Sequence, residues 1–333
     1  MTARSLSLPS LAALSLAFAC LGAAAVPVAA QAQTWPERPI RLLVPLAAGS
    51  TADIASRTVG AELATALGQS VVVENKPGAG GTIAMAEVAR AAPDGYTISF
   101  ASQGTLVFNQ ALYSRPGYDS LADFEFITLL GGVSNVMIVH PSNPAKTATD
   151  VIAQVKAKAD GMTFSSGGSG TSHHLSGVLF GQKTGTKLIH VPYKGAPQGI
   201  LAVMSGEVDM GFFNTPTVIS QVREGRLKAL GVTSLEPSSL LPGVPTLDKS
   251  GVPGYEVNTW FGFVAPKGTP RPIIERLHKE FTAILARPDL RGKLSGQGFD
   301  LAADTSGAGF RALTEADLKQ WIPVVRASGA KVD

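Results

Sequence analysis

The chain has 333 residues, of which 45% are hydrophobic, and it carries a formal net charge of +3. With 36 Gly and 22 Pro, this composition is typical of a globular, turn-rich protein and argues against a disordered chain. A charge so close to zero, with Lys and Arg scattered along the sequence, argues against a nucleic-acid partner, which requires a concentrated basic face. A length of roughly 300 residues predicts two domains.

The N-terminal segment has the pattern of a secretory signal peptide. Arg4 supplies a positive start, Leu11 to Val28 is apolar and uncharged, and an A-x-A site ends at Ala32. The sequence therefore predicts a signal peptide over residues 1–32 that is cleaved before Gln33. A membrane anchor is the less favoured interpretation, because no basic stop-transfer cluster follows the apolar run.

Removal of residues 1–32 leaves 301 residues, no cysteine, and a net charge of +2, because Arg4 is the only charged residue removed. The one cysteine, Cys20, allows a lipoprotein interpretation, but the residues before it are a poor lipobox. A secreted protein of this size builds a sufficient core without disulfides. No later segment has 18 uninterrupted apolar residues, so we expect the mature protein to be soluble.

In the first part of the mature chain, short apolar runs alternate with helical patterns. This β-α-β-α-β order predicts a parallel sheet with helices on both faces. The expected strands are Ile40–Pro45, Val71–Val73 and Tyr96–Ala101, and the expected helices are Asp53–Gly68 and Thr82–Ala92.

The same alternation returns after a break. The helices expected there are Thr149–Ala159, Ser172–Lys183, Ala196–Ser205 and Val218–Glu224, with strands at Met162–Ser165, Leu188–Val191, Val208–Phe212 and Ala229–Thr233. The C-terminal part is expected to hold a strand near Val257–Ala265 and helices at Pro272–Ala286, Asp289–Gly296 and Phe310–Ala327.

Two segments are candidates for crossings between domains. One is the apolar stretch Phe126–Val139, which Gly131-Gly132 interrupts, and the other is the Pro- and Gly-rich connector Leu240–Gly254. If both cross, residues 33–132 and 255–333 form one lobe and residues 133–254 form a second. Two α/β lobes joined in this way have a hinge and an interlobe cleft, and ligands of open α/β sheets bind outside the carboxyl ends of the strands.

The loop after the first expected strand is small, contains glycine and opens a helix, so its free N–H groups can hold a carboxylate. A competing interpretation is helix capping, because Ser50-x-x-Asp53 fits a capping box and an acid at position 53 would repel an acidic ligand. The candidate ligand-binding residues of this loop are Leu46, Gly49, Ser50, Thr51 and Asp53.

Polar, flexible loops also follow the other expected strands. The loop at Ala79, Gly80 and Gly81 matches neither G-x-G-x-x-G nor a P-loop, so an anion-binding nest and a plain tight turn both remain open. Five such loops together describe a cleft lined with backbone donors and hydroxyl groups from both lobes. The further candidates are Ser102, Gln103, Ser166, Gly168, Ser169, Thr171, His174, Tyr193, Lys194 and Gly195.

The sequence has no pattern that indicates catalysis or a metal site. The residues around Ser169 lack the last glycine of a G-x-S-x-G elbow. His173 and His174 are adjacent, so they point about 100° apart on a helix and are poorly placed to share a metal. We therefore predict no catalytic residue, no metal and no cofactor, and interpret one of the two histidines as a hydrogen-bonding residue at a helix start.

From Trp35 to Asp333 the chain resembles the Bug, or tripartite tricarboxylate transporter, solute-binding receptors. The motifs that carry this resemblance are Val44-Pro45, Gly49, Asp53, Val71–Gly81, Ala92–Thr97, Asp123-Phe124, His190–Ala196, Leu241–Thr246, Trp260-x-Gly262 and Ala265–Pro270.

The resemblance implies a type II periplasmic-binding-protein fold, in which two lobes with doubly wound sheets close over a ligand. It implies a small organic acid as ligand: a di- or tricarboxylate, an acidic amino acid or an aromatic acid. It further implies a periplasmic location and delivery to the membrane subunits of a tripartite tricarboxylate transporter, and we expect a monomer. In the family, ordered water and loop N–H groups hold the carboxylate, which carries over onto Gly49 to Asp53, Ala79 to Gly81, Ser166, Gly168, Gly170, His174 and Leu175.

The chain departs from the family pattern at two places. The first loop of the family usually has an aromatic residue followed by Pro-Gly-Gly, where this chain has Leu46, Ala48, Gly49 and Ser50. An acid that the family often has near the end of a strand is replaced by Phe213. If Phe213 faces the cleft, it would suit a ligand with an apolar or aromatic body. Two other functions stay open at this point: an accessory that presents its ligand to a signalling receptor, and an enzyme on the same fold.

Overall fold

The computed structural model describes Thr2, residues 35–327 and residues 330–332. The predicted signal peptide, apart from Thr2, and Cys20 therefore lie outside the described residues. Residues Pro36–Asp333 form one compact unit, and the following description concerns this unit alone. No helix of the described part has both the length and the hydropathy to span a membrane.

The N-terminal half of the sheet is built on three parallel strands. β1 (Ile40–Val44) lies between β2 (Val71–Asn75) and β3 (Thr97–Ser102), and both pairings are parallel. The predicted parallel order is thus confirmed for these strands. The sheet continues with antiparallel strands, because β9 (Asn258–Pro266) pairs with β3 and also with the N-terminal part of β4 (Phe124–Val139).

β4 is the strand that joins the two halves of the sheet. Its C-terminal residues leave β9 and pair with β7 (Met210–Asn214) and β8 (Lys228–Val232). β7 continues in parallel to β5 (Met162–Ser166), and β5 pairs in parallel with β6 (Leu188–Pro192). The strand order is β2-β1-β3-β9-β4-β7-β5-β6. The predicted α/β fold with two sheets is therefore confirmed, with the refinement that β4 belongs to both.

β4 has a bulge between Leu129 and Gly131, within its pairing with β9. Gly131 has φ +138°, and a Cβ on it would collide with the backbone of Asp300. The short strand β10 (Asp300–Leu301) pairs with β4 at this point. Glycine is therefore required here for a close backbone approach as well as for its positive φ. The exact lobe boundaries stay a prediction.

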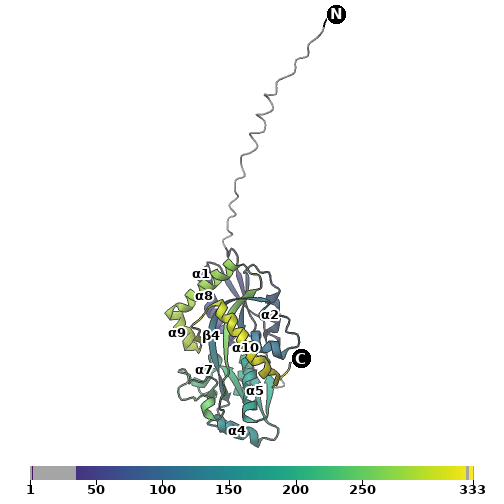
Figure 1. Cartoon of the computed structure of the whole chain (residues 1–333). Helices are drawn as coiled ribbons and strands as arrows, with labels where there is room; N and C mark the ends of the chain where they lie inside the picture. Colours follow the sequence, from purple (N-terminus) through teal and green to yellow (C-terminus); the bar gives the residue numbers. More distant parts are fainter. Residues whose placement is uncertain (1, 3–34, 328–329, 333) are drawn as a thin grey trace. The chain divides into compact units, whose positions relative to one another are not determined.

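The helices begin and end largely where the sequence predicts. Ser50 caps α1 with its side chain and Gly68 ends it in the left-handed conformation, and Thr147 and Asp150 form a capping box at α4. In Figure 1, α1, α8 and α9 lie toward one end of the compact unit, α4 lies at the other, and β4 runs between them. The helices are α1 (Thr51–Leu67), α2 (Thr82–Ala89), α3 (Asn109–Leu112), α4 (Ala148–Ala157), α5 (Ser172–Thr184), α6 (Ala196–Met204), α7 (Thr215–Arg223), α8 (Arg271–Ala286), α9 (Pro288–Gln297) and α10 (Gly307–Ala327).

Two helical features differ from the prediction. α7 begins at Thr215 because Pro216 stands in its first turn, where a missing N–H costs nothing. A π-helical turn over Gly104–Phe108 leads into α3. The sequence hides this turn, because Leu106, Val107 and Phe108 are consecutive buried residues and show no helical periodicity.

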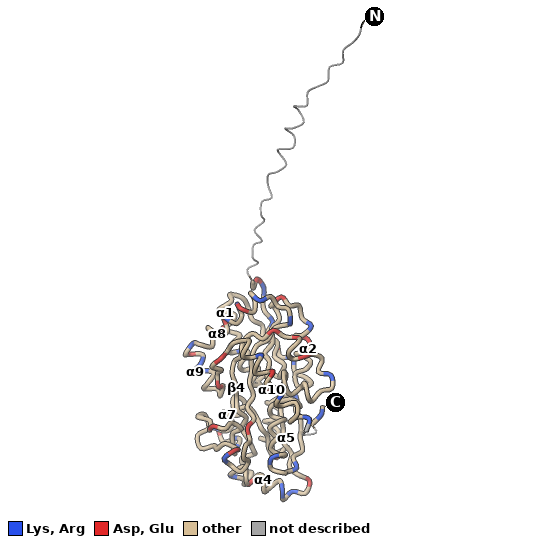
Figure 2. Tube along the Cα trace, viewed as in Figure 1, with Lys and Arg blue, Asp and Glu red and all other residues tan. Residues whose placement is uncertain are grey.

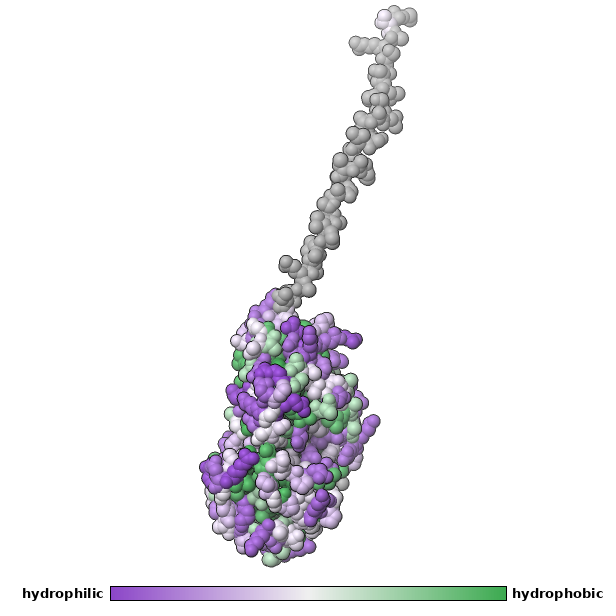
Figure 3. Space-filling model, turned by 90° about the vertical axis from the view of Figure 1, so that its left-hand side faces the viewer, coloured by the Kyte–Doolittle hydropathy of each residue, from purple (hydrophilic) through white to green (hydrophobic). Residues whose placement is uncertain are grey.

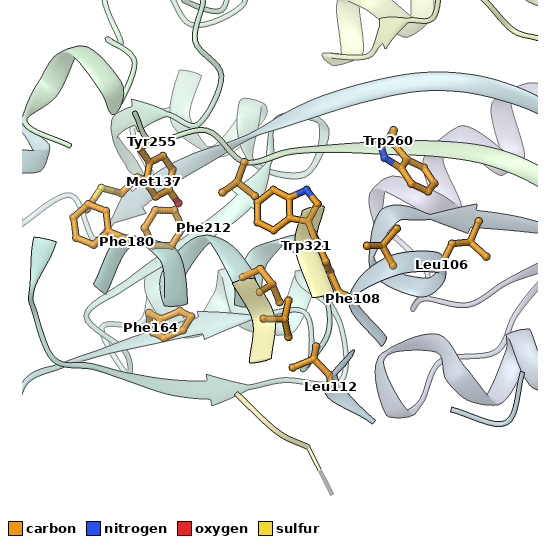
Figure 4. Close-up of a cluster of buried hydrophobic side chains, with 14 of the residues drawn as sticks. Leu106, Phe108, Leu112, Met137, Phe164, Phe180, Phe212, Tyr255, Trp260 and Trp321 are labelled. Carbon is orange, nitrogen blue, oxygen red and sulfur yellow. The ribbon is translucent and has the colours of Figure 1, made fainter. Parts of the chain in front are cut away.

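Two clusters of buried side chains stabilise the halves. The larger one contains aromatic residues from both ends of the chain, including Phe108, Phe212, Trp260 and Trp321 (Figure 4). The smaller one packs α6 and α7 against β4 and β7, around Phe213. Acidic and basic residues are interspersed along the trace (Figure 2), and hydrophobic and hydrophilic residues are mixed over the face in Figure 3.

Candidate functional site

The loops that follow the strands of both halves enclose a cavity of about 600 Å³, here called the front cavity. Lys194 is the one charged residue among the described residues that line it. Eight predicted site residues lie in its wall. They are Leu46, Ala79, Gly80 and Gly81 from the first half and Gly168, Ser169, Tyr193 and Lys194 from the second.

Three backbone N–H groups in the wall of the front cavity are available to a ligand. The N–H groups of Ala79 and Gly80 stand at the start of a short 3₁₀ turn over Ala79–Gly81, where no preceding turn supplies acceptors. The N–H of Ser169 is the third; none of the three has an acceptor within the described part of the chain. Lys194 has no ion-pair partner there either. One ammonium group and three free amides from both halves make the front cavity complementary to a carboxylate.

A much smaller inner cavity of about 20 Å³ lies deeper between the halves. A cavity of this size holds about one water molecule. Leu46, Gly80, Ser102 and Thr171 line it as predicted site residues. Gly170, which the family resemblance suggested, lines it too. Its other walls include Gly104, Ser172, His173, Asn214, Thr259 and Phe261, which the sequence interpretation did not select.

Asn214, at the end of β7, is the centre of a buried polar network beside the inner cavity. Its Oδ1 accepts from Thr51 Oγ1 at 3.0 Å and lies 3.0 Å from His173 Nε2. Its Nδ2 donates to Asn135 Oδ1 at 2.5 Å. The network therefore links α1 of the first half to β7, α5 and β4 of the second. Thr51 serves the site through this contact and not by lining a cavity.

The histidines at the start of α5 organise the Gly-rich loop before it. Nδ1 of His173 accepts from Gly167 N–H, and Nδ1 of His174 accepts from Gly170 N–H. Because Nδ1 of His173 is an acceptor, its proton is on Nε2 and is donated to Asn214. Burial, only partly opposed by this bond to Asn214, lowers the pKa of His173 to about 4. Both histidines thus act as neutral acceptors that fix the loop.

Ser166 and His190 also help to fix the conformation of this loop. Ser166 Oγ accepts from Gly168 N–H and lies 2.7 Å from His190 Nε2. The His190 ring stacks on His174 with centroids 4.1 Å apart. Burial, together with repulsion from His174, lowers the pKa of His190 to about 3. The predicted residues Ser166 and His174 therefore contact the loop and line neither the front nor the inner cavity.

Glycines allow the two halves to touch across the inner cavity. A Cβ on Gly104 would come 2.7 Å from the Gly170 carbonyl oxygen, and one on Gly195 would come 2.5 Å from Ala47 Cβ. A Cβ on Gly80 would collide with the Ser169 carbonyl oxygen. The predicted residue Gly195 thus contributes a close contact between halves. Any larger side chain at these positions would push the halves apart.

In the first loop, Ser50 and Asp53 are engaged in capping. Ser50 Oγ accepts from Asp53 N–H, and the Asp53 carboxylate accepts from Gly49 N–H at 2.9 Å and from Arg57 Nε at 2.9 Å. Burial alone would raise the pKa of Asp53, but the bonds from Arg57 and Gly49 outweigh it and lower the pKa. Gly49, Ser50 and Asp53 line neither cavity, so a ligand role for them stays a prediction and the capping interpretation explains their contacts.

Two further predicted residues point elsewhere. Phe213 is fully buried in the smaller core cluster, where it packs against His173 with centroids 4.9 Å apart. The idea that Phe213 faces the cleft is therefore corrected: β7 directs this residue into the core. Gln103 lies outside both cavities because its side chain turns toward α10 and donates to Asp317.

The rule that ligands bind after the carboxyl ends of strands could also have pointed to Asn214. It is the last residue of β7, and it follows Phe212 and Phe213 directly. The expected strand ended at Phe212, two residues early, so the polar residue at its carboxyl end was overlooked. One of the two adjacent histidines was interpreted as a helix-start residue without a choice between them, and the contact of His173 with Asn214 depends on tertiary structure. Within the described residues, no group of three or more acidic, His or Cys side chains is arranged to hold a metal ion.

Comparison with known proteins identifies the family. Residues 55–330 match the model of the tripartite tricarboxylate transporter family receptor, TctC. The chain belongs to this family. Its members are solute-binding receptors, which agrees with the resemblance seen in the sequence.

Solved structures of the family have the same fold. The periplasmic binding protein BugD is 34% identical, with a TM-score of 0.85 over 89% of this chain and 99% of BugD. Rpa4515 of R. palustris, solved with adipate, is 31% identical, with a TM-score of 0.86 over 89% of this chain and 98% of that one. MatC from Rhodopseudomonas palustris, solved with bound malate, is 30% identical, with a TM-score of 0.84 over 87% of this chain and all of that one (100%). The chain therefore has the two-lobed periplasmic-binding-protein fold of its family.

Proposed function

We propose that this TctC receptor resides in the periplasm, binds a small organic carboxylate between its lobes and delivers it to the membrane subunits of a tripartite tricarboxylate transporter. The observation that carries the proposal is the front cavity, which combines an unpaired Lys194 with the free N–H groups of Ala79, Gly80 and Ser169. Adipate in Rpa4515 and malate in MatC support a carboxylate ligand. Among the described residues no other charged side chain lines the cavity, so a carboxylate there meets no described acid.

Closure of the lobes follows from the same contacts. Ligand donors come from both halves, so a carboxylate that binds all of them favours the arrangement in which the halves touch. The Gly104–Gly170 contact belongs to this arrangement. A receptor that changes shape on binding can signal occupancy to its membrane partner, which is the basis of delivery.

The proposal is tested by thermal shift and calorimetry of the refolded, ligand-stripped mature protein with adipate, malate and other small acids. A hundredfold excess over Kd stabilises the folded state by about 2.7 kcal/mol, which raises Tm by several degrees. We expect a shift with at least one acid and none with its diamide. If no acid raises Tm, the proposal of a carboxylate ligand is contradicted. Delivery is tested separately, by measuring uptake of the acid into cells with and without the membrane subunits.

Two glycine variants test closure. Gly104→Ala is compatible with its backbone conformation, since its φ is not positive, and it places a methyl group against Gly170. Overpacking of this kind costs about 1–3 kcal/mol, so we expect roughly tenfold weaker binding of the acid. Gly292→Ala, on α9, is the matched control, because its Cβ meets nothing within 4 Å. Equal affinities of the two variants would show that the Gly104 contact has no part in closure.

A further inference from the structure

The segment Ala330–Val332, which follows α10 in the chain, contributes a wall residue to the front cavity. Val332 is among the residues that line this cavity. Two contacts hold the segment beside α3. The N–H of Val332 donates to the carbonyl oxygen of Leu112 at 3.2 Å, and Ala330 packs against the larger core cluster, to which Leu112 belongs (Figure 4). Val332 therefore has a defined place in the wall of the carboxylate site.

Val332 and Tyr113 form a wall next to the carboxylate donors. Tyr113 follows Leu112 directly, so its backbone lies beside the carbonyl group that accepts from Val332, and its side chain lines the cavity too. A Cβ on Gly80 would lie 3.1 Å from the Tyr113 hydroxyl oxygen and would collide with the Ser169 carbonyl oxygen. The Tyr113 side chain therefore extends from the backbone beside Val332 to the place where Gly80 and Ser169 meet.

The positive groups of the front cavity match one carboxylate. Lys194 is the one cation among the described residues of the wall. It follows Tyr193, whose carbonyl oxygen is 3.4 Å from the position of a Cβ on Gly168, the residue before Ser169. The Lys194 backbone is thus on the side of the free N–H groups. The apolar and aromatic residues of the remaining wall are Pro45, Leu46, Pro77, Tyr113, Pro192, Tyr193 and Val332.

This distribution of charge disfavours a ligand with two carboxylates. Once Lys194 and the N–H groups hold the first, a second carboxylate beside Val332 would meet no further cation among the described wall residues. A charge placed against apolar groups without a partner is unfavourable. Val332 is 37% exposed, so apolar surface is open to a ligand there, and its removal from water is favourable. A hydrocarbon body therefore gains from contact with Val332.

We propose that Val332 is a specificity-determining residue of the front cavity, and that it selects an acid with one carboxylate and an apolar body. The carboxylate accepts from the N–H groups of Gly80 and Ser169, and the body packs along Tyr113 to Val332. This role of Val332 rests on the proposed function, because it concerns the ligand of the same cavity.

The test compares hexanoate with adipate by calorimetry of the refolded, ligand-stripped mature protein. The two acids have the same chain length, and adipate has a second carboxylate where hexanoate has a methyl group. We expect the wild-type protein to bind hexanoate about tenfold more tightly than adipate. Adipate bound as tightly as hexanoate, or no saturable binding of hexanoate, would overturn the role of Val332. If other acids raise Tm while hexanoate does not bind, the carboxylate site stands and the role of Val332 alone fails.

Valine variants locate the effect. Val332→Lys places an ammonium group in the apolar wall, so we expect the preference for hexanoate over adipate to fall about fivefold. Val72→Lys is the matched control, because Val72, on β2, is 50% exposed and does not line the front cavity. We expect this control to leave the ratio of the two Kd values unchanged.

A smaller change tests the apolar contact itself. Val332→Ala removes hydrocarbon without adding charge and is expected to weaken binding of hexanoate about threefold, whereas Val72→Ala is expected to leave it unchanged. Thermal unfolding of each variant shows that it is folded. An equal ratio of Kd values in the Val332→Lys and Val72→Lys proteins would show that Val332 does not face the ligand and would refute the proposal.

Discussion

The polar network around Asn214 predicts that this residue holds the two halves of the sheet together. Replacing it by Leu keeps the number and branching of the side-chain heavy atoms but removes every polar atom. Thr51 can rotate its hydroxyl toward another acceptor, whereas Asn135 Oδ1 and His173 Nε2–H lose their partners in a buried setting. Asn214→Leu therefore leaves two buried polar groups unsatisfied.

The cost follows from these two groups. A buried donor or acceptor without a partner costs about 1–3 kcal/mol. The added apolar surface of Leu returns part of this cost. We therefore expect Asn214→Leu to lower the free energy of unfolding by about 2–4 kcal/mol.

Urea unfolding of the mature protein, followed by circular dichroism, measures this loss. Asn109→Leu is the matched control. Asn109 is also fully buried, but its side chain donates to Gly80 O at 3.0 Å, and its Oδ1 has no partner. We expect the control to lose about 1 kcal/mol or less. Equal losses in the two variants would refute the argument, because buried volume and not the network would then determine stability.

Two further predictions concern titratable groups. The pKa of His173 is about 4 in the folded protein against 6.5 for an ordinary histidine, so the unfolded state binds more protons between these values and stability falls as the pH decreases through this window. We expect His173 alone to lower the free energy of unfolding by about 2 kcal/mol between pH 7 and pH 5. Urea unfolding at both pH values measures this loss, and we expect it to be smaller in His173→Gln. A loss of the same size in the variant would contradict a neutral, buried His173. Asp53 has a lowered pKa, so it stabilises the fold above its unfolded pKa, near 3.8, and this contribution is lost as the pH falls through the lowered value. Asp53→Asn is expected to lose about 1 kcal/mol at pH 7 while calorimetry gives the same Kd for the acid; a Kd raised more than threefold would instead support a ligand role.

The strand and helix order was predictable because it depends on local signals. A short apolar run predicts β1, and the Ser50-x-x-Asp53 cap predicts the start of α1. The structure has both elements. The long strand β4 was visible only as an apolar stretch with a break at Gly131-Gly132. Its continuity depends on pairing with β9, more than 100 residues away in sequence. Such long-range pairing leaves no local periodicity to find.

The candidate site was predictable as a set of loops but not residue by residue. The rule that ligands bind after strands selected Gly80, Ser169 and Lys194, which all line the front cavity. It could not separate Gly80, whose N–H is free, from Gly49, whose N–H is bonded to Asp53. Nor could it show that β7 turns Phe213 inward. These outcomes depend on which acceptors the fold brings near each N–H group, and they appear only in three dimensions.

In the Gly-rich loop before α5, most backbone N–H groups already have acceptors within the fold. Glycine loops are costly to order when a ligand must fix them. In this loop the N–H groups of Gly167, Gly168 and Gly170 are already held by His173, Ser166 and His174. Of these four successive N–H groups, only that of Ser169 has no acceptor in the described part of the chain. The buried histidines therefore order the loop during folding, so the Ser169 N–H that we propose as a donor to the carboxylate is fixed before the ligand binds.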